Sequence, residues 1–136
     1  MSLKYQKYDI VNGNIPDSLI SLKGYSLYRK DRDNGRGGGI CIFLDEEIST
    51  TFQISIIPFD TPTGCESLAV NFLSSKFSLS ICCIYRPFFV PIPDMDFSLF
   101  NSIKNFSLSN KNVIIAGDFN MSYLSWPLQP HSPYNE

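Results

Sequence analysis

The sequence has a single histidine, and none of its four cysteines form a Cys-x-x-Cys pair. Structural zinc sites use closely spaced cysteine and histidine ligands, so this composition argues against one. The first residues, MSLKYQKYD, contain no apolar stretch typical of a secretory signal. No apolar run approaches the ~20 residues that span a bilayer. We therefore expect an intracellular chain that binds no membrane; the sequence does not distinguish nucleus from cytoplasm.

An excess of one charge is also absent. Eleven Lys and Arg residues stand against thirteen Asp and Glu residues, giving a formal net charge of -2. Nucleic-acid-binding domains usually carry a basic excess, because phosphate contacts dominate their affinity. The charge balance therefore neither supports DNA binding nor excludes it. The basic segment from Lys30 to Arg36 also contains two Asp residues, which favours a solvated loop.

Apolar residues are plentiful, at 43% of 136 residues, which predicts one domain over residues 1–136 with its own core. Cys41, Cys82 and Cys83 stand within apolar runs, where free cysteine behaves as a small hydrophobic residue. That usage is typical of a reducing compartment. The segment 127–136 contains three prolines and is predicted to be an irregular tail.

Apolar segments bounded by turn residues predict six strands, near 25–30, 39–44, 51–57, 66–73, 77–85 and 113–117. A Ser-Ser turn joins two of them into a predicted hairpin, and the run SICCIY suits a strand covered on both faces. The last strand, VIIAG, is predicted to be short and buried. The glycines at 37–39 allow another segment to approach closely. One main helix is predicted within 95–109, with Phe97, Phe100 and Ile103 on its core-facing stripe and Phe106 and Leu108 as candidate further members.

Two polar pairs follow apolar strands. Asp118 and Asn120 come directly after VIIAG, and side chains two apart in an extended segment project to the same face. An aspartate there can orient or deprotonate a water, and an asparagine amide can donate to a phosphate oxygen. Tyr85 and Arg86 end the strand at 77–85, where a phenol and a guanidinium can hold a phosphodiester. Taken separately, each pair also fits an ordinary strand-ending turn, with Arg86 solvated.

Taken in order, the segments GGGICIFL, ESLAVNFL, CCIYRP, an amphipathic helix and VIIAGDFN resemble the endonuclease domain of non-LTR retrotransposons. That domain belongs to the endonuclease/exonuclease/phosphatase superfamily, and the resemblance runs from about residue 14 to 126. It implies an α+β fold: a partial four-layer α/β sandwich of the DNase I-like kind, with mostly antiparallel strands and one main helix. It also implies Mg²⁺-dependent cleavage of DNA phosphodiesters, which nicks target DNA for reverse transcription. We expect a monomer.

The resemblance also assigns roles. The family tyrosine that matches Tyr85 contacts the phosphate, the aspartate that matches Asp118 orients the attacking water, and the asparagine that matches Asn120 helps to hold the site. Arg86, next to Tyr85, is the candidate substrate-binding residue. Glu66 matches a glutamate common in the family, and we interpret it as packing or polar support rather than a metal ligand.

The sequence departs from the family at both ends, so we interpret it as truncated there. The family's metal-binding glutamate corresponds to a position near Tyr8, and the first 45 residues contain no glutamate. The family's closing Ser-Asp-His segment would lie beyond Glu136, and His131 follows GDFN too closely to replace it. Because Mg²⁺ requires several oxygen ligands, we predict no tightly bound metal and little activity from this chain as given. The competing hypotheses are an inactive remnant that at most binds nucleic acid or protein, and an unstable product with no role.

Overall fold

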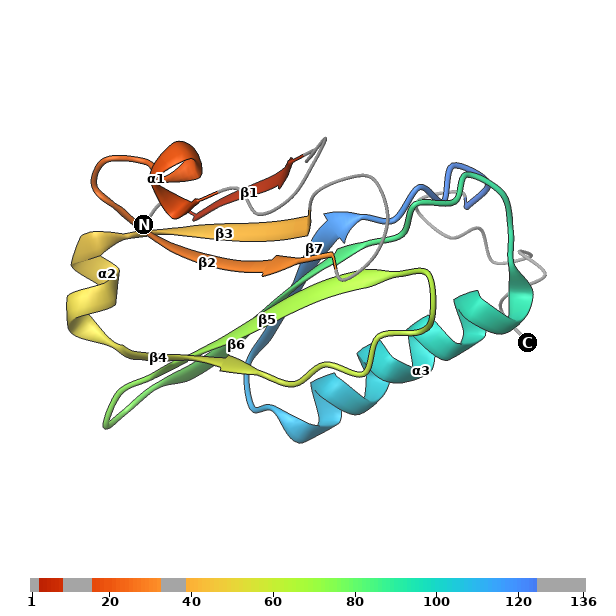
Figure 1. Ribbon diagram of the computed structural model, residues 1–136. Coiled ribbons are helices and arrows are strands. Elements are labelled where there is room, and N and C mark those ends of the chain that lie inside the picture. Colours follow the sequence, from red (N-terminus) through yellow and green to blue (C-terminus); the bar gives the residue numbers. More distant parts are fainter. Residues whose placement is uncertain (1–2, 9–15, 33–38, 125–136) are drawn as a thin grey trace.

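The computed structural model describes residues 3–8, 16–32 and 39–124. Two sheets lie face to face, and one long helix covers the outer face of the second sheet (Figure 1). The elements in chain order are β1 (Leu3–Tyr8), α1 (Asp17–Ile20), β2 (Tyr25–Asp31), β3 (Gly39–Asp45), α2 (Glu46–Thr51), β4 (Gln53–Ile57), β5 (Glu66–Leu73), β6 (Ser78–Tyr85), α3 (Pro93–Ser109) and β7 (Val113–Asp118). Within these described ranges, no helix is both long and apolar enough to cross a membrane.

The two sheets differ in how their strands pair. The first has the order β1-β3-β2 and is antiparallel throughout, and the second has the order β4-β5-β6-β7. In the second sheet β6 and β7 are parallel, so α3 serves as the crossover between them. The predicted hairpin of β5 and β6 is confirmed by their eight-residue antiparallel register. The α+β fold class predicted from the sequence is confirmed.

The main core lies between the sheets, where alternate residues of β3 meet alternate residues of β5 and β6. Its buried members are Ile40, Ile42, Leu44, Leu68, Val70, Phe72, Ile81, Cys83 and Tyr85. The other faces of β5 and β6 contribute Ala69, Cys82 and Ile84 to a second cluster with α3. Strand β6 is therefore covered on both sides, as its unbroken apolar sequence predicted.

Helix α3 buries only part of the predicted stripe. Its buried residues are Leu99, Ser102 and Phe106, and Ile103 packs against the same cluster. Phe97, Phe100 and Leu108 are 71%, 49% and 77% exposed, so the prediction was wrong for these three, because aromatic spacing alone set the phase of the helix. The residues that face the sheet, Leu99, Ser102 and Phe106, are spaced three and four apart along the helix.

Three further differences concern the ends and edges of elements. The strand predicted at 51–57 begins only at Gln53, because Asp45 Oδ1 accepts from the N–H of Glu47 at 3.0 Å and caps helix α2. Strand β1 lies at an edge of the first sheet and was not predicted. Strand β7 lies at an edge of the described second sheet, and its Ile114 is 46% exposed, so the predicted burial of β7 was wrong. The predicted tail at 127–136 and His131 lie outside the described residues.

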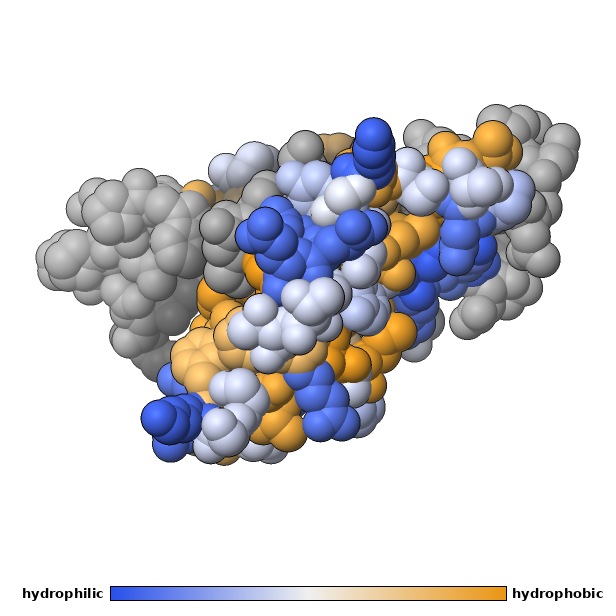
Figure 2. Space-filling view, turned by 90° about the vertical axis from the view of Figure 1, so that its left-hand side faces the viewer, coloured by the Kyte–Doolittle hydropathy of each residue, from blue (hydrophilic) through white to orange (hydrophobic). Residues whose placement is uncertain are grey.

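Figure 2 shows the end of the molecule on the left of Figure 1, around α2, where hydrophilic and hydrophobic side chains are interspersed. Strands β2, β6 and β7 run toward the right of Figure 1 and finish near its middle. Gly39 lies at the same end, opposite Asp31, the last residue of β2. A Cβ on Gly39 would stand 2.2 Å from the carbonyl oxygen of Lys30, so glycine is required for β3 to run this close to β2, as predicted.

Candidate active site

Three polar side chains form a row across the second sheet at the end where β6 and β7 finish. Tyr85 is the last residue of β6, and its register partners are Glu66 on β5 and Asp118 on β7. Directly paired residues present their side chains to the same face of a sheet. Because neighbouring strands lie ~4.8 Å apart, the backbones of Glu66 and Asp118 are separated by roughly 10 Å, with Tyr85 between them. We call this the Glu66–Tyr85–Asp118 row.

Gly117 allows β7 to approach β6 just before the row. It pairs with Ile84, and a Cβ on Gly117 would stand 1.8 Å from the carbonyl oxygen of Ile84. Its φ of +148° is also one that side-chain-bearing residues rarely adopt. The close approach sets the lateral position of Asp118 beside Tyr85.

Asp118 and Asn120 are in contact, although not in the predicted way. Asp118 is exposed, and its Oδ1 accepts from the backbone N–H of Asn120 at 3.3 Å. Strand β7 ends at Asp118, and Asn120 has a φ of +50°, so the expectation that both side chains extend from one strand face is wrong. The amide of Asn120 turns back instead, and its Nδ2 donates to the carbonyl oxygen of Arg86 at 2.7 Å. Asparagine tolerates this left-handed conformation better than most residues.

Tyr85 is held by packing. It is 7% exposed, and its ring belongs to the core between the sheets together with Ile40 and Leu68. The ring is therefore fixed in position, and only a small part of it faces solvent. Its role as a phosphate contact stays a prediction.

Arg86 is fully buried, with 0% of its surface exposed. Its Nε donates to Asp96 Oδ1 at 2.7 Å, its Nη2 donates to the carbonyl oxygen of Val90 at 2.6 Å, and its Nη1 donates to the carbonyl oxygen of Phe88. The sequence alternative of a solvated arginine is therefore wrong. The guanidinium also has no surface to offer a substrate, so in this arrangement Arg86 positions the segment after β6 rather than binding the phosphodiester.

Asp96, at the start of α3, completes this buried contact. Its Oδ2 accepts from the hydroxyl of Tyr123 at 2.7 Å and from the N–H of Ile92 at 3.1 Å. Burial alone would raise the pKa of Asp96, but the hydrogen bonds from Arg86, Tyr123 and Ile92 outweigh it, and the net effect is a lowered pKa. The carboxylate is thus ionised at neutral pH and neutralises the buried guanidinium.

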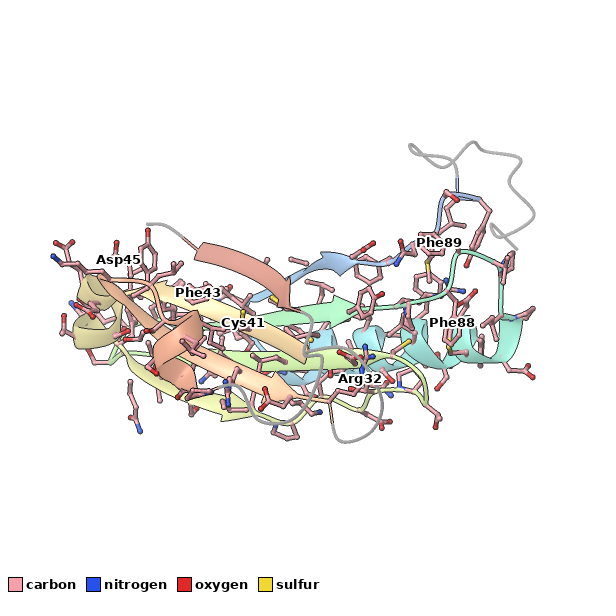
Figure 3. The ribbon with its side chains drawn as sticks, turned by 45° about the horizontal axis from the view of Figure 1, so that its top comes forward. Arg32, Cys41, Phe43, Asp45, Phe88 and Phe89 are labelled. Carbon is pink, nitrogen blue, oxygen red and sulfur yellow. The ribbon has the colours of Figure 1, made fainter. Side chains whose placement is uncertain are left out.

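The loop that Arg86 holds presents aromatic side chains at the same end of the molecule (Figure 3). The ring of Phe88 lies against Gly64, where a Cβ would stand 3.0 Å from it. Phe89 is 71% exposed. Pro87 precedes these two phenylalanines and Pro91 comes after Val90, and both prolines limit the backbone freedom of the loop.

A cavity of about 600 Å³ opens at this end, between β2 and the start of β5. Polar and apolar surface contribute equally to its lining, which comprises Lys30, Asp31, Arg32, Ile40, Thr63, Gly64, Cys65, Glu66, Ser67 and Pro87. Arg32 forms an ion pair with Glu66 across the cavity, through Nε at 2.5 Å and also through Nη2. The sequence identified Glu66 only as polar support and placed Arg32 in a solvated loop. Arg32 and Glu66 are 34 residues apart in the chain, so no local sequence pattern indicates that they pair.

The residues described at this end do not by themselves make a magnesium site. In ranges 3–8, 16–32 and 39–124, no group of three His, Cys, Asp or Glu side chains could hold a metal ion. Asp118 offers one carboxylate and Asn120 one amide, whereas Mg²⁺ takes near-octahedral oxygen coordination. Tyr8, near which the resemblance predicts the family's glutamate position, is at the same end of the molecule, because Tyr8 pairs with Gly39 and Gly39 pairs with Asp31.

Comparison with known proteins gives one match, to a family model. No curated protein and no solved structure matches it. A family model described as the Endonuclease/Exonuclease/phosphatase family matches residues 5–135, which include all three members of the Glu66–Tyr85–Asp118 row. That match covers nearly the whole of the sequence, and the chain belongs to the endonuclease/exonuclease/phosphatase family.

Proposed function

We propose that this chain is an endonuclease-type domain of retrotransposon origin. We further propose that the end of its second sheet that carries the Glu66–Tyr85–Asp118 row contacts a DNA phosphodiester. The observation that carries the proposal is the pairing of Asp118 with Tyr85 at the carboxyl ends of adjacent parallel strands. Ligands commonly bind at such strand ends. The family is one of hydrolases that generally require a metal and generally act on nucleic acid, and the ordered motifs resemble those of non-LTR retrotransposons.

The proposed roles follow from position and chemistry. Tyr85 contacts a phosphate oxygen, and the exposed carboxylate of Asp118 accepts a hydrogen bond from the attacking water. Asn120 holds Asp118 and the exit of β6 together through its bonds to both. Mg²⁺, when bound, would neutralise charge on the phosphodiester. The described residues provide too few ligands for it, which favours a second candidate function, DNA binding without cleavage.

The test exploits the charge of Asp118. Without metal, the Asp118 carboxylate repels a neighbouring phosphate, so Asp118→Asn should bind a short DNA duplex several-fold more tightly than the wild-type chain. Glu46→Gln is the matched control, because it removes one exposed carboxylate from α2 at the opposite end of the molecule. Fluorescence anisotropy with a labelled duplex, in buffer containing a chelator, measures both variants.

The two variants separate a local contact from a general charge effect. A gain for Asp118→Asn alone supports phosphate contact at the row. Equal gains for both variants would mean that only net charge matters, and a wild-type chain that does not bind DNA at low salt would overturn the proposal.

A further inference from the structure

The cavity beside the Glu66–Tyr85–Asp118 row has its own polar chemistry. Its volume of about 600 Å³ lies within the ~300–1,000 Å³ typical of small-ligand sites. Two cations, Lys30 and Arg32, and two anions, Asp31 and Glu66, line it. Glu66 belongs to both the cavity and the row, so the cavity adjoins the row on the β5 side.

Glu66 fixes the orientation of the Arg32 guanidinium. Nε and Nη2 of Arg32 both donate to the same oxygen, Glu66 Oε1, which sets the plane of the guanidinium group. Because Glu66 occupies the Nε–Nη2 edge, a phosphate oxygen would be met by the remaining N–H donors, on Nη1 and on the outer side of Nη2. Figure 3 shows Arg32 where the end of β2 meets the second sheet.

The ion pair is accessible and contributes little to stability. The Arg32 and Glu66 side chains are 27% and 20% exposed, so both can be reached from solvent. Partly exposed ion pairs of this kind contribute little to folding, about 0–1 kcal/mol. Functional side chains are held in one geometry by supporting hydrogen bonds, and Glu66 gives such support to Arg32 at the cavity.

We propose that Arg32, positioned by Glu66, binds a phosphodiester that flanks the one at Tyr85 and Asp118. The row and the cavity together would then contact two successive phosphates of one strand. The balanced lining charges of the cavity suit a singly charged phosphodiester rather than a polyphosphate. This inference rests on the proposed function, because it assumes that DNA lies along the row.

The experiment removes one phosphate charge at a time from the DNA. A labelled oligonucleotide duplex is made as a set, each member carrying a single neutral methylphosphonate at a different position. Binding is measured by anisotropy for wild type, Arg32→Gln and Glu66→Ala. Arg29→Gln is the matched control, since Arg29 lies on β2 shortly before Arg32, its side chain is 21% exposed, and it is not one of the residues that line the cavity.

We expect the wild-type chain to lose roughly tenfold in affinity when the methylphosphonate replaces the flanking phosphate, the size of one charge-assisted hydrogen bond. Arg32→Gln should bind unmodified DNA with a similar loss and show no further loss at that position. The slope of log affinity against log salt should also fall in magnitude by about 1. Glu66→Ala also removes a charge that repels DNA, so its overall affinity is not informative. The informative quantity is the ratio of affinities for unmodified DNA and for DNA with the methylphosphonate at that position, and this ratio should fall toward one.

The outcomes separate this inference from the function on which it rests. A wild-type chain that fails to bind DNA overturns both. DNA binding with identical methylphosphonate profiles in wild type and Arg32→Gln overturns the Arg32 subsite and leaves the proposed function standing. Discrimination that persists in Glu66→Ala overturns the positioning role of Glu66. Arg29→Gln should retain the wild-type profile, and circular dichroism should show that each variant is folded.

Discussion

Asn120 Nδ2 donates to the carbonyl oxygen of Arg86 at 2.7 Å and thereby joins the segments that leave two neighbouring strands. A second bond runs the other way along the same boundary, from the N–H of Arg86 to the carbonyl oxygen of Asp118 at 2.9 Å. Together they hold the exposed carboxylate of Asp118 against the exit of β6. The guanidinium of Arg86 lies in the buried contact with Asp96.

The first prediction concerns cleavage. Purified chain should not relax supercoiled plasmid appreciably with Mg²⁺ or Mn²⁺, because Asp118 and Asn120 offer one carboxylate and one amide, too few to fix a divalent ion against water. Agarose gel electrophoresis after prolonged incubation is the measurement, with Asp118→Ala beside it. Metal-dependent nicking that disappears in Asp118→Ala would show that the site holds more ligands than the described residues provide.

The second prediction concerns the buried ion pair. Asp96→Asn should lower the free energy of unfolding by about 3–5 kcal/mol, because it leaves the fully buried guanidinium of Arg86 without its counter-charge. Chemical denaturation at pH 7 measures this. The control is Asp94→Asn, an exposed aspartate in the same first turn of α3, which should cost less than about 1 kcal/mol. Equal losses for the two variants would contradict the prediction.

The same pair predicts a pH dependence. The pKa of Asp96 is lowered in the folded chain, so its ionised form contributes stability that is fully present above the unfolded-state pKa of about 4. That contribution is lost as the pH falls through the lower, folded-state pKa. The difference in unfolding free energy between wild type and Asp96→Asn should therefore be constant from neutral pH down to about 5 and shrink below about 4. A difference that stays unchanged at pH 3 would contradict the assignment.

The third prediction concerns the approach of β7 to β6. Gly117→Ala should destabilise the chain by at least about 2 kcal/mol, because it adds a clash with the Ile84 carbonyl to an unfavourable φ. Gly24→Ala is the control: Gly24 has a φ of +82° and nothing within 4 Å of the added Cβ, so it suffers the backbone strain alone. Thermal unfolding compares the two. Equal effects would mean that the close approach beside Asp118 contributes nothing.

The fourth prediction concerns thiol reactivity. Burial raises the pKa of Cys82 to about 12 and that of Cys83 to about 11, so at neutral pH both remain protonated and unreactive. Burial also raises the pKa of Cys65, an effect that the Arg86 charge opposes, and Cys65 is only partly buried. A thiol reagent should therefore label Cys65 first in the folded chain. Mass spectrometry after limited labelling identifies the site, and early labelling of Cys82 would contradict the packing of β6.

The sequence determined most of the strand positions by itself. Strands β2, β3, β5 and β6 lie within one or two residues of their predicted ranges, because their alternating or continuous apolar residues and bounding turn residues are local signals. The place of Tyr85 and Asp118 at strand ends was also determined locally. The pattern GDFN after an apolar strand required no tertiary information.

Tertiary structure decided which side chains meet and which faces are buried. Arg86 is a buried partner of Asp96 because α3 packs against the segment that leaves β6. Arg32 is a partner of Glu66 because the two sheets lie face to face. The buried stripe of α3 was set by the position of the sheet beneath it, which helical spacing alone could not fix. Asn120 left the expected strand face because a single left-handed residue redirects the chain. Local periodicity specifies which elements form, whereas long-range pairing determines their partners and thereby the composition of the site.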